Sequence, residues 1–331
     1  ILRAMGYDAN DEFKGSGWEI RVASTAQQRS LLVNINAGTL GTGASREMVA
    51  EILFQAITKN TVAYTPALGY YTADLIDGIA TESLGYKTFG LEKTVGEITA
   101  VDYQDGTTTL TEVVDKYNKN DKLISDNDLG DSTVIAETDA DWTKIGYMAY
   151  AWTVKTANAK TRTTVSDVTV TGTSLGVSTN GTPWSVLTKD IDLNETNNSE
   201  DVRYYLNGEE TTYAAVKDLI PEVGVKVDFI DNDNSGRAEV VVVTHYTAAE
   251  VTGIATDVNA GSNATKKDSY YLKNLSDGTS GRETVATKNL VCADELAMYD
   301  VVTYVEYNGD YYVTVAPLTT DIFEEITRAK V

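Results

Sequence analysis

The chain has 331 residues, 42% of them hydrophobic and 23% charged, so it is long enough for two or more folding units and too apolar for wholesale disorder. Its 27 Lys and Arg residues against 49 Asp and Glu residues give a formal charge of −22, which repels phosphate backbones and anionic headgroups. We therefore expect no nucleic-acid partner and no membrane-surface partner. The sequence also lacks an apolar run of about 18 residues, the length that a membrane-spanning helix needs.

Cysteine and histidine each occur once, as Cys292 and His245. A single cysteine excludes an intrachain disulfide and a cysteine-based zinc site. His245 follows the valine run 240–243, where we expect an ordinary histidine at the end of a strand rather than a catalytic base. We therefore predict no catalytic residue, no metal and no cofactor. The many carboxylates leave open a glycosidase-type acid pair, which depends on spatial separation.

Helical spacing of apolar residues is clearest between residues 49 and 57. There the apolar residues recur at intervals of three and four, which predicts one face of an amphipathic helix: Val49, Ile52, Leu53, Ala56 and Ile57. Ser45 is placed to cap the start of this helix, and Glu47 falls in its first turn. A weaker helix is expected from Trp18 to about Leu32.

After about Val95 the pattern changes to short β-branched runs separated by Asn-Gly and Asp-Gly pairs, which are strong hairpin signals: Asp105-Gly106, Asn180-Gly181, Asn207-Gly208 and Asn308-Gly309. One predicted hairpin pairs 301–307 with 311–315. A second pairs 223–229 with 239–244 through a turn at 231–236.

The order of these signals predicts an α+β, mainly β chain, in which a short helical segment precedes small antiparallel β-barrel or sandwich modules. We expect a helical segment at 1–63, a connecting segment at 64–94, β modules at 95–165, 166–247 and 248–320, and a tail at 321–331. The similarity of 96–101 to 249–254 suggests that modules begin alike, and a short helix is expected at 213–220 within the second module.

Two segments of the helical region resemble a known family. The run GYDANDEFKGSGWEIRVA at 6–23 resembles the junction between the second and third S-layer homology repeats of surface proteins from Gram-positive Firmicutes. The run ASREMVAEIL at 44–53 looks like the Thr-Arg-(Ala/Glu)-Glu helix start of such a repeat, with Ser45 at the usual threonine position. The resemblance covers about residues 1–60. The later β-rich part is similar, less specifically, to the modules that follow these repeats.

The resemblance implies an extracellular structural protein of the cell wall or S-layer, held non-covalently by a secondary cell-wall polysaccharide. The implied polysaccharide-binding residues are Arg46, Trp18 and Ser45. A guanidinium can pair with a carboxylate such as a pyruvyl ketal, and an indole ring can stack on a sugar face. Self-association in a surface lattice is a further expected partnership. The alternatives are a surface adhesin or glycan-binding module and a wall-anchored carbohydrate-active enzyme.

The segment DNDNSG at 231–236 reproduces the first half of a calcium-binding loop, with oxygen-bearing side chains at positions one, three and five and glycine at position six. Position twelve, where such loops carry a bidentate acid, is Val242. We therefore expect a turn rich in Asp and Asn at this place, without a metal.

Overall fold

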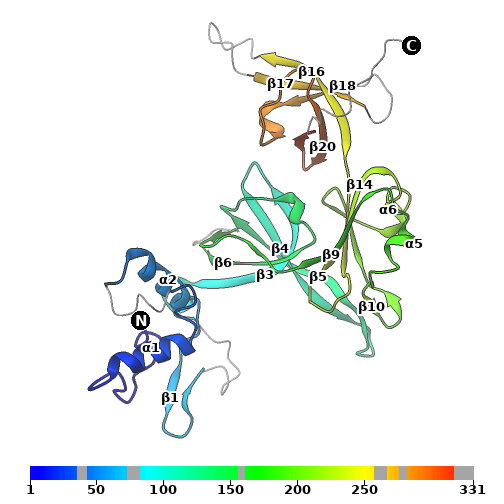
Figure 1. Cartoon of the computed structure of the whole chain (residues 1–331). Helices are drawn as coiled ribbons and strands as arrows, with labels where there is room; N and C mark the ends of the chain where they lie inside the picture. Colours follow the sequence, from blue (N-terminus) through cyan, green and yellow to red (C-terminus); the bar gives the residue numbers. More distant parts are fainter. Residues whose placement is uncertain (36–42, 73–82, 156–160, 257–266, 276–281, 317–331) are drawn as a thin grey trace, which may run out of the picture. The chain divides into compact units, whose positions relative to one another are not determined.

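The computed structural model describes residues 1–35, 43–72, 83–155, 161–256, 267–275 and 282–316 (Figure 1). It confirms a mainly β chain with a smaller helical share. The chain divides into two compact units. The first unit comprises residues 1–94 and 151–167, and the second comprises 95–150 and 168–331.

The first unit is built mainly from helices: α1 (Trp18–Gln28), α2 (Arg46–Ile57) and α4 (Leu84–Phe89), with the hairpin β1 (Ala63–Thr65) and β2 (Gly69–Tyr71). α1 ends earlier than the predicted Leu32. The core consists of small and apolar side chains from the start of the chain and from the helices: Leu2, Met5, Tyr7, Ala26, Leu31, Leu32 and Ala56. Several apolar residues of α2 remain exposed, notably Val49 at 42% and Leu53 at 45%.

The segment 64–94, predicted to be a connection, contains folded elements in its described part. β2 packs against the helical core through Tyr70, whose hydroxyl donates to the Glu12 carboxylate at 2.9 Å and accepts from the Ala9 N–H at 2.7 Å. A tyrosine that supplies both an apolar ring and a hydrogen-bonded hydroxyl ties this hairpin to the residues before α1. The hairpin therefore belongs to the helical segment. Residues 73–82 lie outside the described part.

The first sheet contains β3 (Leu91–Asp102), β4 (Thr107–Tyr117), β5 (Leu123–Ala136), β6 (Met148–Lys155), β7 (Arg162–Thr164) and β8 (Thr169–Val170). β3 to β5 form an antiparallel meander, and the predicted turn at Asp105-Gly106 joins its first two strands. β6 pairs antiparallel with β7 and β8. A one-turn 3-10 helix (Trp142–Lys144) precedes β6.

The second sheet has the strand order β13-β12-β15-β14-β9. Its strands are β9 (Thr173–Asn180), β12 (Arg203–Leu206), β13 (Glu209–Thr211), β14 (Val223–Asp231) and β15 (Val240–His245). The predicted hairpins at 223–244 and at Asn207-Gly208 are confirmed. Two short helices, α5 (Trp184–Leu187) and α6 (Tyr213–Val216), and the small pair β10 (Glu195–Thr196) and β11 (Ser199–Glu200) fill the connections.

Three expectations for the second module need correction. β12 pairs in parallel with β15, although we predicted antiparallel modules. β13, α6 and β14 lie between the two strands in the chain, so β12 meets β15 without a direct turn. Asn180-Gly181 ends β9 and leads through Pro183 into α5 rather than into a hairpin. The helix expected at 213–220 has only four residues as α6.

The third sheet has the order β18-β17-β16-β20-β21-β19. Its strands are β16 (Thr247–Thr256), β17 (Lys267–Asn274), β18 (Arg282–Ala286), β19 (Leu290–Val291), β20 (Val301–Tyr307) and β21 (Asp310–Val315), with a 3-10 helix at Thr287–Asn289. The predicted hairpin of β20 and β21 is confirmed, and β19 adds in parallel to β21. Among the described residues, no helix is long and apolar enough to cross a membrane.

Candidate functional site

Two of the three residues implied in polysaccharide binding lie together at the start of α2. Ser45 is the N-cap, and its Oγ accepts a hydrogen bond from the Met48 N–H at 3.2 Å. Arg46 is the first residue of the helix and is exposed. Glu47 lies in the same turn. Hydrogen bonds from the Glu47 backbone N–H and from Ser45 lower the pKa of the Glu47 carboxyl. The first turn therefore presents the Arg46 guanidinium, while the N–H groups of Glu47 and Met48 are already bonded within the turn.

Trp18 lies elsewhere in the same unit, at the first position of α1, and is 46% exposed. It borders a mainly apolar groove with a volume of about 540 Å³. The groove is lined by residues from the chain start, α1 and α2: Ile1, Leu2, Arg3, Phe13, Trp18, Glu19, Val22, Ala23, Ala26, Leu31, Leu32 and Ile52. Arg46 and Ser45 are not part of this lining, so the structure does not join the three residues into one pocket.

The loop between β14 and β15 is folded around the Asp231 side chain. The carboxylate of Asp231 accepts hydrogen bonds from the Ser235 N–H at 3.2 Å and from the Gly236 N–H at 2.9 Å. Asn234 and Gly236 adopt the left-handed backbone conformation, with φ of 63° and 84°. Asparagine and glycine tolerate this conformation best, so the local sequence specifies the turn. The predicted turn rich in Asp and Asn is present.

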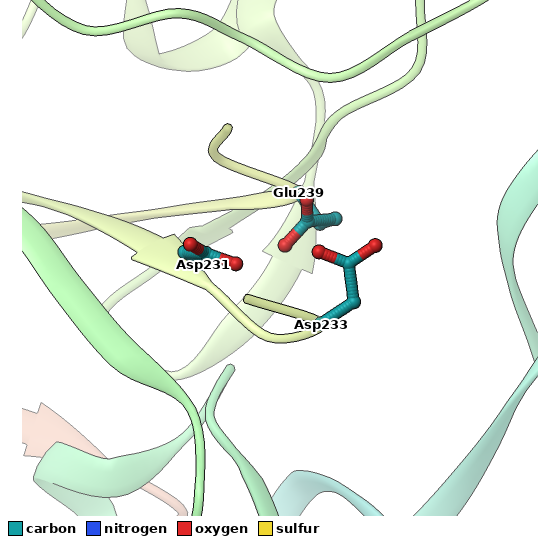
Figure 2. Close-up of side chains that lie close together, drawn as sticks. All are labelled: Asp231, Asp233 and Glu239. Atoms are coloured by element: carbon teal, nitrogen blue, oxygen red, sulfur yellow. The ribbon is translucent and has the colours of Figure 1, made fainter. Parts of the chain in front are cut away.

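Three carboxylates converge in this loop, those of Asp231, Asp233 and Glu239, with one oxygen of each within 4.8 Å of the others (Figure 2). Asp231 and Glu239 are buried, while Asp233 is exposed. Burial, together with the charges of Asp233 and Asp231, raises the pKa of Glu239 to about 6. Carboxylate oxygens are the ligands that Ca²⁺ prefers, so the arrangement can hold a hard divalent cation.

Glu239 was missed in the sequence because we looked for a closing acid only at position twelve of the loop. Val242 does occupy that position, in β15, where it pairs with Asp228 and Tyr205. Glu239 stands at position nine, and the short β14–β15 connection turns its carboxylate back toward the loop (Figure 2). The sequence signal that could have identified Glu239 is an acidic residue at position nine of the loop. The sequence predicts a metal-free loop from Val242 alone. Glu239 supplies a third carboxylate that this prediction did not consider, so calcium binding becomes the test of it.

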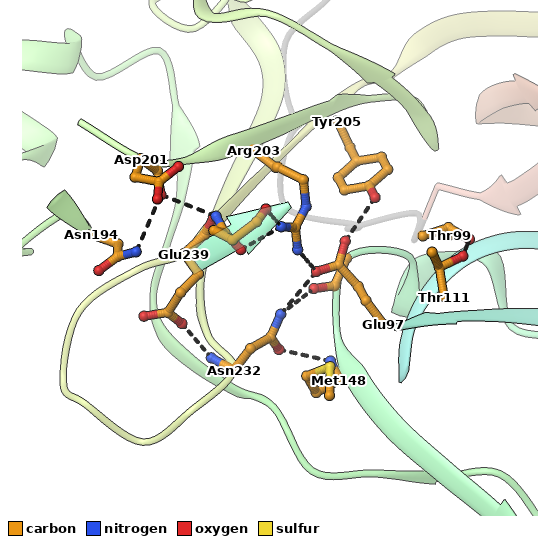
Figure 3. A network of polar contacts seen from close by, with 12 residues as sticks. Glu97, Thr99, Thr111, Met148, Asn194, Asp201, Arg203, Tyr205, Asn232 and Glu239 are labelled. Atoms are coloured by element: carbon orange, nitrogen blue, oxygen red, sulfur yellow. Dashed lines mark hydrogen bonds and ion pairs between the residues drawn. The ribbon is translucent and has the colours of Figure 1, made fainter. Parts of the chain in front are cut away.

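A second polar cluster is buried around Glu97 of β3, which is fully enclosed (Figure 3). Its carboxylate forms an ion pair with the Arg203 guanidinium of β12. It also accepts hydrogen bonds from the Tyr205 hydroxyl at 2.7 Å and from the Asn232 Nδ2 at 3.2 Å. Arg203 in turn donates to the backbone and side-chain oxygens of Asn127 on β5. These contacts connect the first and second sheets.

Asn232 links the acidic loop to the Glu97 cluster. Its backbone N–H donates to Glu239 Oε2 at 2.7 Å, while its side-chain Oδ1 accepts from the Met148 N–H at 2.7 Å. Its Nδ2 also donates to the Gly146 carbonyl at 2.9 Å. Asn232 therefore connects the Glu239 carboxylate to the backbone of β6. We expect a structural change in the loop to alter the contacts between the first and second sheets.

Comparison of the chain with protein-family models, with curated proteins and with solved structures gave no match. The family resemblance therefore rests on the residues quoted for it. His245, the single histidine, lies half-buried at the end of β15, and its backbone N–H donates to the Asn207 Oδ1 at 2.8 Å. Glu97 is sealed from solvent, so it is not placed to act on a substrate.

Proposed function

We propose that the chain is a structural protein of the bacterial cell surface, of the S-layer type, held by a secondary cell-wall polysaccharide through its helical segment. The β part forms small barrel or sandwich modules that extend from this anchor. Its location is extracellular, and the chemistry is binding and assembly rather than catalysis. The observation that carries the proposal is the start of α2, where a capping Ser45 precedes an exposed Arg46.

The electrostatics of this helix start favour an anionic sugar. The first backbone N–H groups of a helix have no partner within the helix, and its dipole is positive at this end. Arg46 adds five donors in a planar fork that matches a carboxylate. Although the chain as a whole is strongly acidic, the Arg46 guanidinium and the positive end of the helix dipole both favour an acidic sugar substituent at this turn.

Exposed apolar residues of the helical unit also support this assignment. Val49 and Leu53 of α2 are 42% and 45% exposed, and Ile20 of α1 is 75% exposed. Repeat units bury such faces against neighbouring repeats of the same kind, because one repeat alone cannot cover them. The uncovered faces therefore fit a unit of a repeat set, and the groove beside Trp18 gives an apolar surface for a sugar ring.

A wall-binding experiment tests the proposal. The full chain is incubated with wall sacculi that retain the polysaccharide and with sacculi from which it has been stripped. A charge-assisted pair contributes about 1.5–3 kcal/mol, so Arg46→Ala should weaken binding roughly tenfold to hundredfold. Arg46→Lys should recover only part of the loss, because an ammonium cannot form the bidentate pair.

The matched control is Arg237→Ala, which removes an exposed arginine of the other unit. It should bind like the wild type. Thermal stability of Arg46→Ala should stay within about 0.5 kcal/mol, because the side chain is exposed. Equal binding to both kinds of sacculi, or unchanged binding by Arg46→Ala, would contradict polysaccharide recognition at this turn.

A further inference from the structure

The free edges of the sheets differ in how they are protected. An exposed edge strand presents unpaired backbone groups, and proteins usually protect it by making it short or by placing charged residues on it. In the third sheet, one edge strand is β18, which carries Arg282 and Glu283, and the other is β19, which has two residues. In the second sheet, one edge strand is the three-residue β13, which carries Glu209 and Glu210.

β9 is the exception among these edges. It has eight residues, it pairs with β14 on one side, and no strand follows it on the other side within the described part of the chain. Its sequence, TSLGVSTN, contains no charged residue. Leu175 is 36% exposed and Val177 is 53% exposed. A long, uncharged strand with exposed aliphatic side chains is the kind of edge that pairs with another chain.

The sequence around β9 extends this neutral character. No Asp, Glu, Lys or Arg occurs between Asp167 and Lys189, which is the longest uncharged interval of the chain. In a protein with a formal charge of −22, most approaches between two copies bring like charges together. The β9 edge is a place where two copies can meet without that repulsion. A basic partner would instead be attracted to the acidic surfaces.

We propose that the β9 edge is an interface between copies of this chain, in which a strand of a second copy pairs with the outer edge of β9. The choice of a second copy rests on the proposed function, since a structural surface protein requires contacts between copies. A bulge in the β9–β14 ladder makes Leu175 an extra residue, which shortens the regular stretch available to a partner strand. We therefore expect a weak contact that is reinforced when many copies are arrayed.

The test is sedimentation equilibrium of the full chain up to about 1 mM, where contacts of weak affinity become populated. Val177→Lys places a charge on the edge and should raise the dissociation constant at least tenfold. The same substitution reduces the net negative charge, so relief of general repulsion would change association in the opposite direction. Val114→Lys on β4, where the valine is 37% exposed, is the matched control and should associate like the wild type.

Each outcome decides the proposal. Concentration-dependent association that Val177→Lys abolishes and Val114→Lys retains supports it, provided that both variants melt like the wild type. A wild type that stays monomeric at about 1 mM overturns it, as does normal association of Val177→Lys. Binding of Val177→Lys to sacculi is measured in parallel. Loss of association with intact wall binding separates this interface from the anchoring function, which can fail independently.

Discussion

At the scale of single residues, the acidic loop concentrates negative charge that the folded chain must accommodate. Asp231 and Glu239 are buried beside Asp233, and the pKa of Glu239 is raised to about 6 by burial and by its two acidic neighbours. A raised pKa in the folded state favours the protonated form. The corresponding stability is present below the ordinary pKa near 4.5 and is lost as the pH rises through about 6.

A divalent cation can offset this loss, because it replaces the proton as the partner of the three carboxylates. We expect calcium to raise the melting temperature at pH 7 and to have less effect at pH 5, where Glu239 keeps its proton. A concentration one hundred times the dissociation constant would add about 2.7 kcal/mol. Differential scanning calorimetry with calcium and with a chelator measures the effect.

The Asp233→Asn variant should lose most of this stabilisation, since it removes one of the three carboxylates. Asp139→Asn changes the charge equally at an exposed position outside the loop and should behave like the wild type. If calcium and chelator give the same melting temperature at pH 7, the loop is a metal-free turn, as the valine at position twelve led us to predict.

Glu97 provides a second prediction at this scale. Replacing it with glutamine keeps the shape but leaves the Arg203 guanidinium buried without its counter-charge. Breaking a buried ion pair from one side costs about 3–5 kcal/mol, so the free energy of unfolding of Glu97→Gln should fall by about that amount. Denaturant titration measures it. Glu112→Gln on β4 alters an exposed glutamate and should change stability by less than about 0.5 kcal/mol.

Replacing both partners distinguishes the buried charge from the packing. The double variant Glu97→Leu with Arg203→Met should be more stable than Glu97→Gln, because no unpaired charge remains buried. A small loss in Glu97→Gln, below about 1 kcal/mol, would mean that water or another group compensates Arg203.

Residues of the site differ in how readily the sequence reveals them. The Ser45 cap could be predicted because a cap acts on residues three positions away. Glu239 could also have been predicted, since it is only eight residues after Asp231. Its prediction requires acidic residues to be considered at loop positions other than twelve. The Glu97 cluster could not be predicted, because Arg203 and Tyr205 are 106 and 108 residues away in the chain.

At the scale of elements, strands that are joined by a local turn could be predicted, whereas pairings between strands distant in the chain could not. The β14–β15 and β20–β21 hairpins follow from alternation and a local turn. The parallel pairs β12–β15 and β19–β21 join strands that a local turn does not connect. Alternation and local turns do not indicate which strands pair in these two cases. Such pairings are decided by burial of the whole sheet.

Close approach of β3 and β4 at Gly96 gives a prediction for an element. A Cβ at this position would lie 2.6 Å from the Thr111 carbonyl oxygen, which belongs to the backbone of β4 and cannot move alone. Gly96→Ala should therefore force the two strands apart and cost about 1–3 kcal/mol, as overpacking does. Urea titration of the variant measures the loss.

Gly130→Ala on β5 is the matched control. There the nearest atom to a new Cβ is a methyl group of Val114 at 3.0 Å, and that side chain is 37% exposed and can adjust. We expect a change of less than about 0.5 kcal/mol in this variant. Similar losses in both variants would show that the β3–β4 ladder adapts, and that Gly96 is not required for the close approach.

At the scale of the whole molecule, the division into two compact units bears on how the chain unfolds. The first unit has its own small core, which includes Met5 and Leu31, both 1% exposed. The second unit contains separate cores in its second and third sheets, and Phe229 is fully buried in the first of these. Units with separate cores need not unfold in one transition.

We therefore expect calorimetry to resolve at least two transitions, each sensitive to substitutions in its own core. Met5→Ala should destabilise the first unit by about 2–5 kcal/mol and leave the other transition unchanged, because Met5 belongs to the core of that unit. Phe229→Ala should cost about 3–5 kcal/mol and shift only a transition of the second unit. Far-UV circular dichroism identifies the transition in which the helices melt. A single transition that both substitutions shift equally would mean that the two units unfold as one, so that the anchor and the β part share their stability.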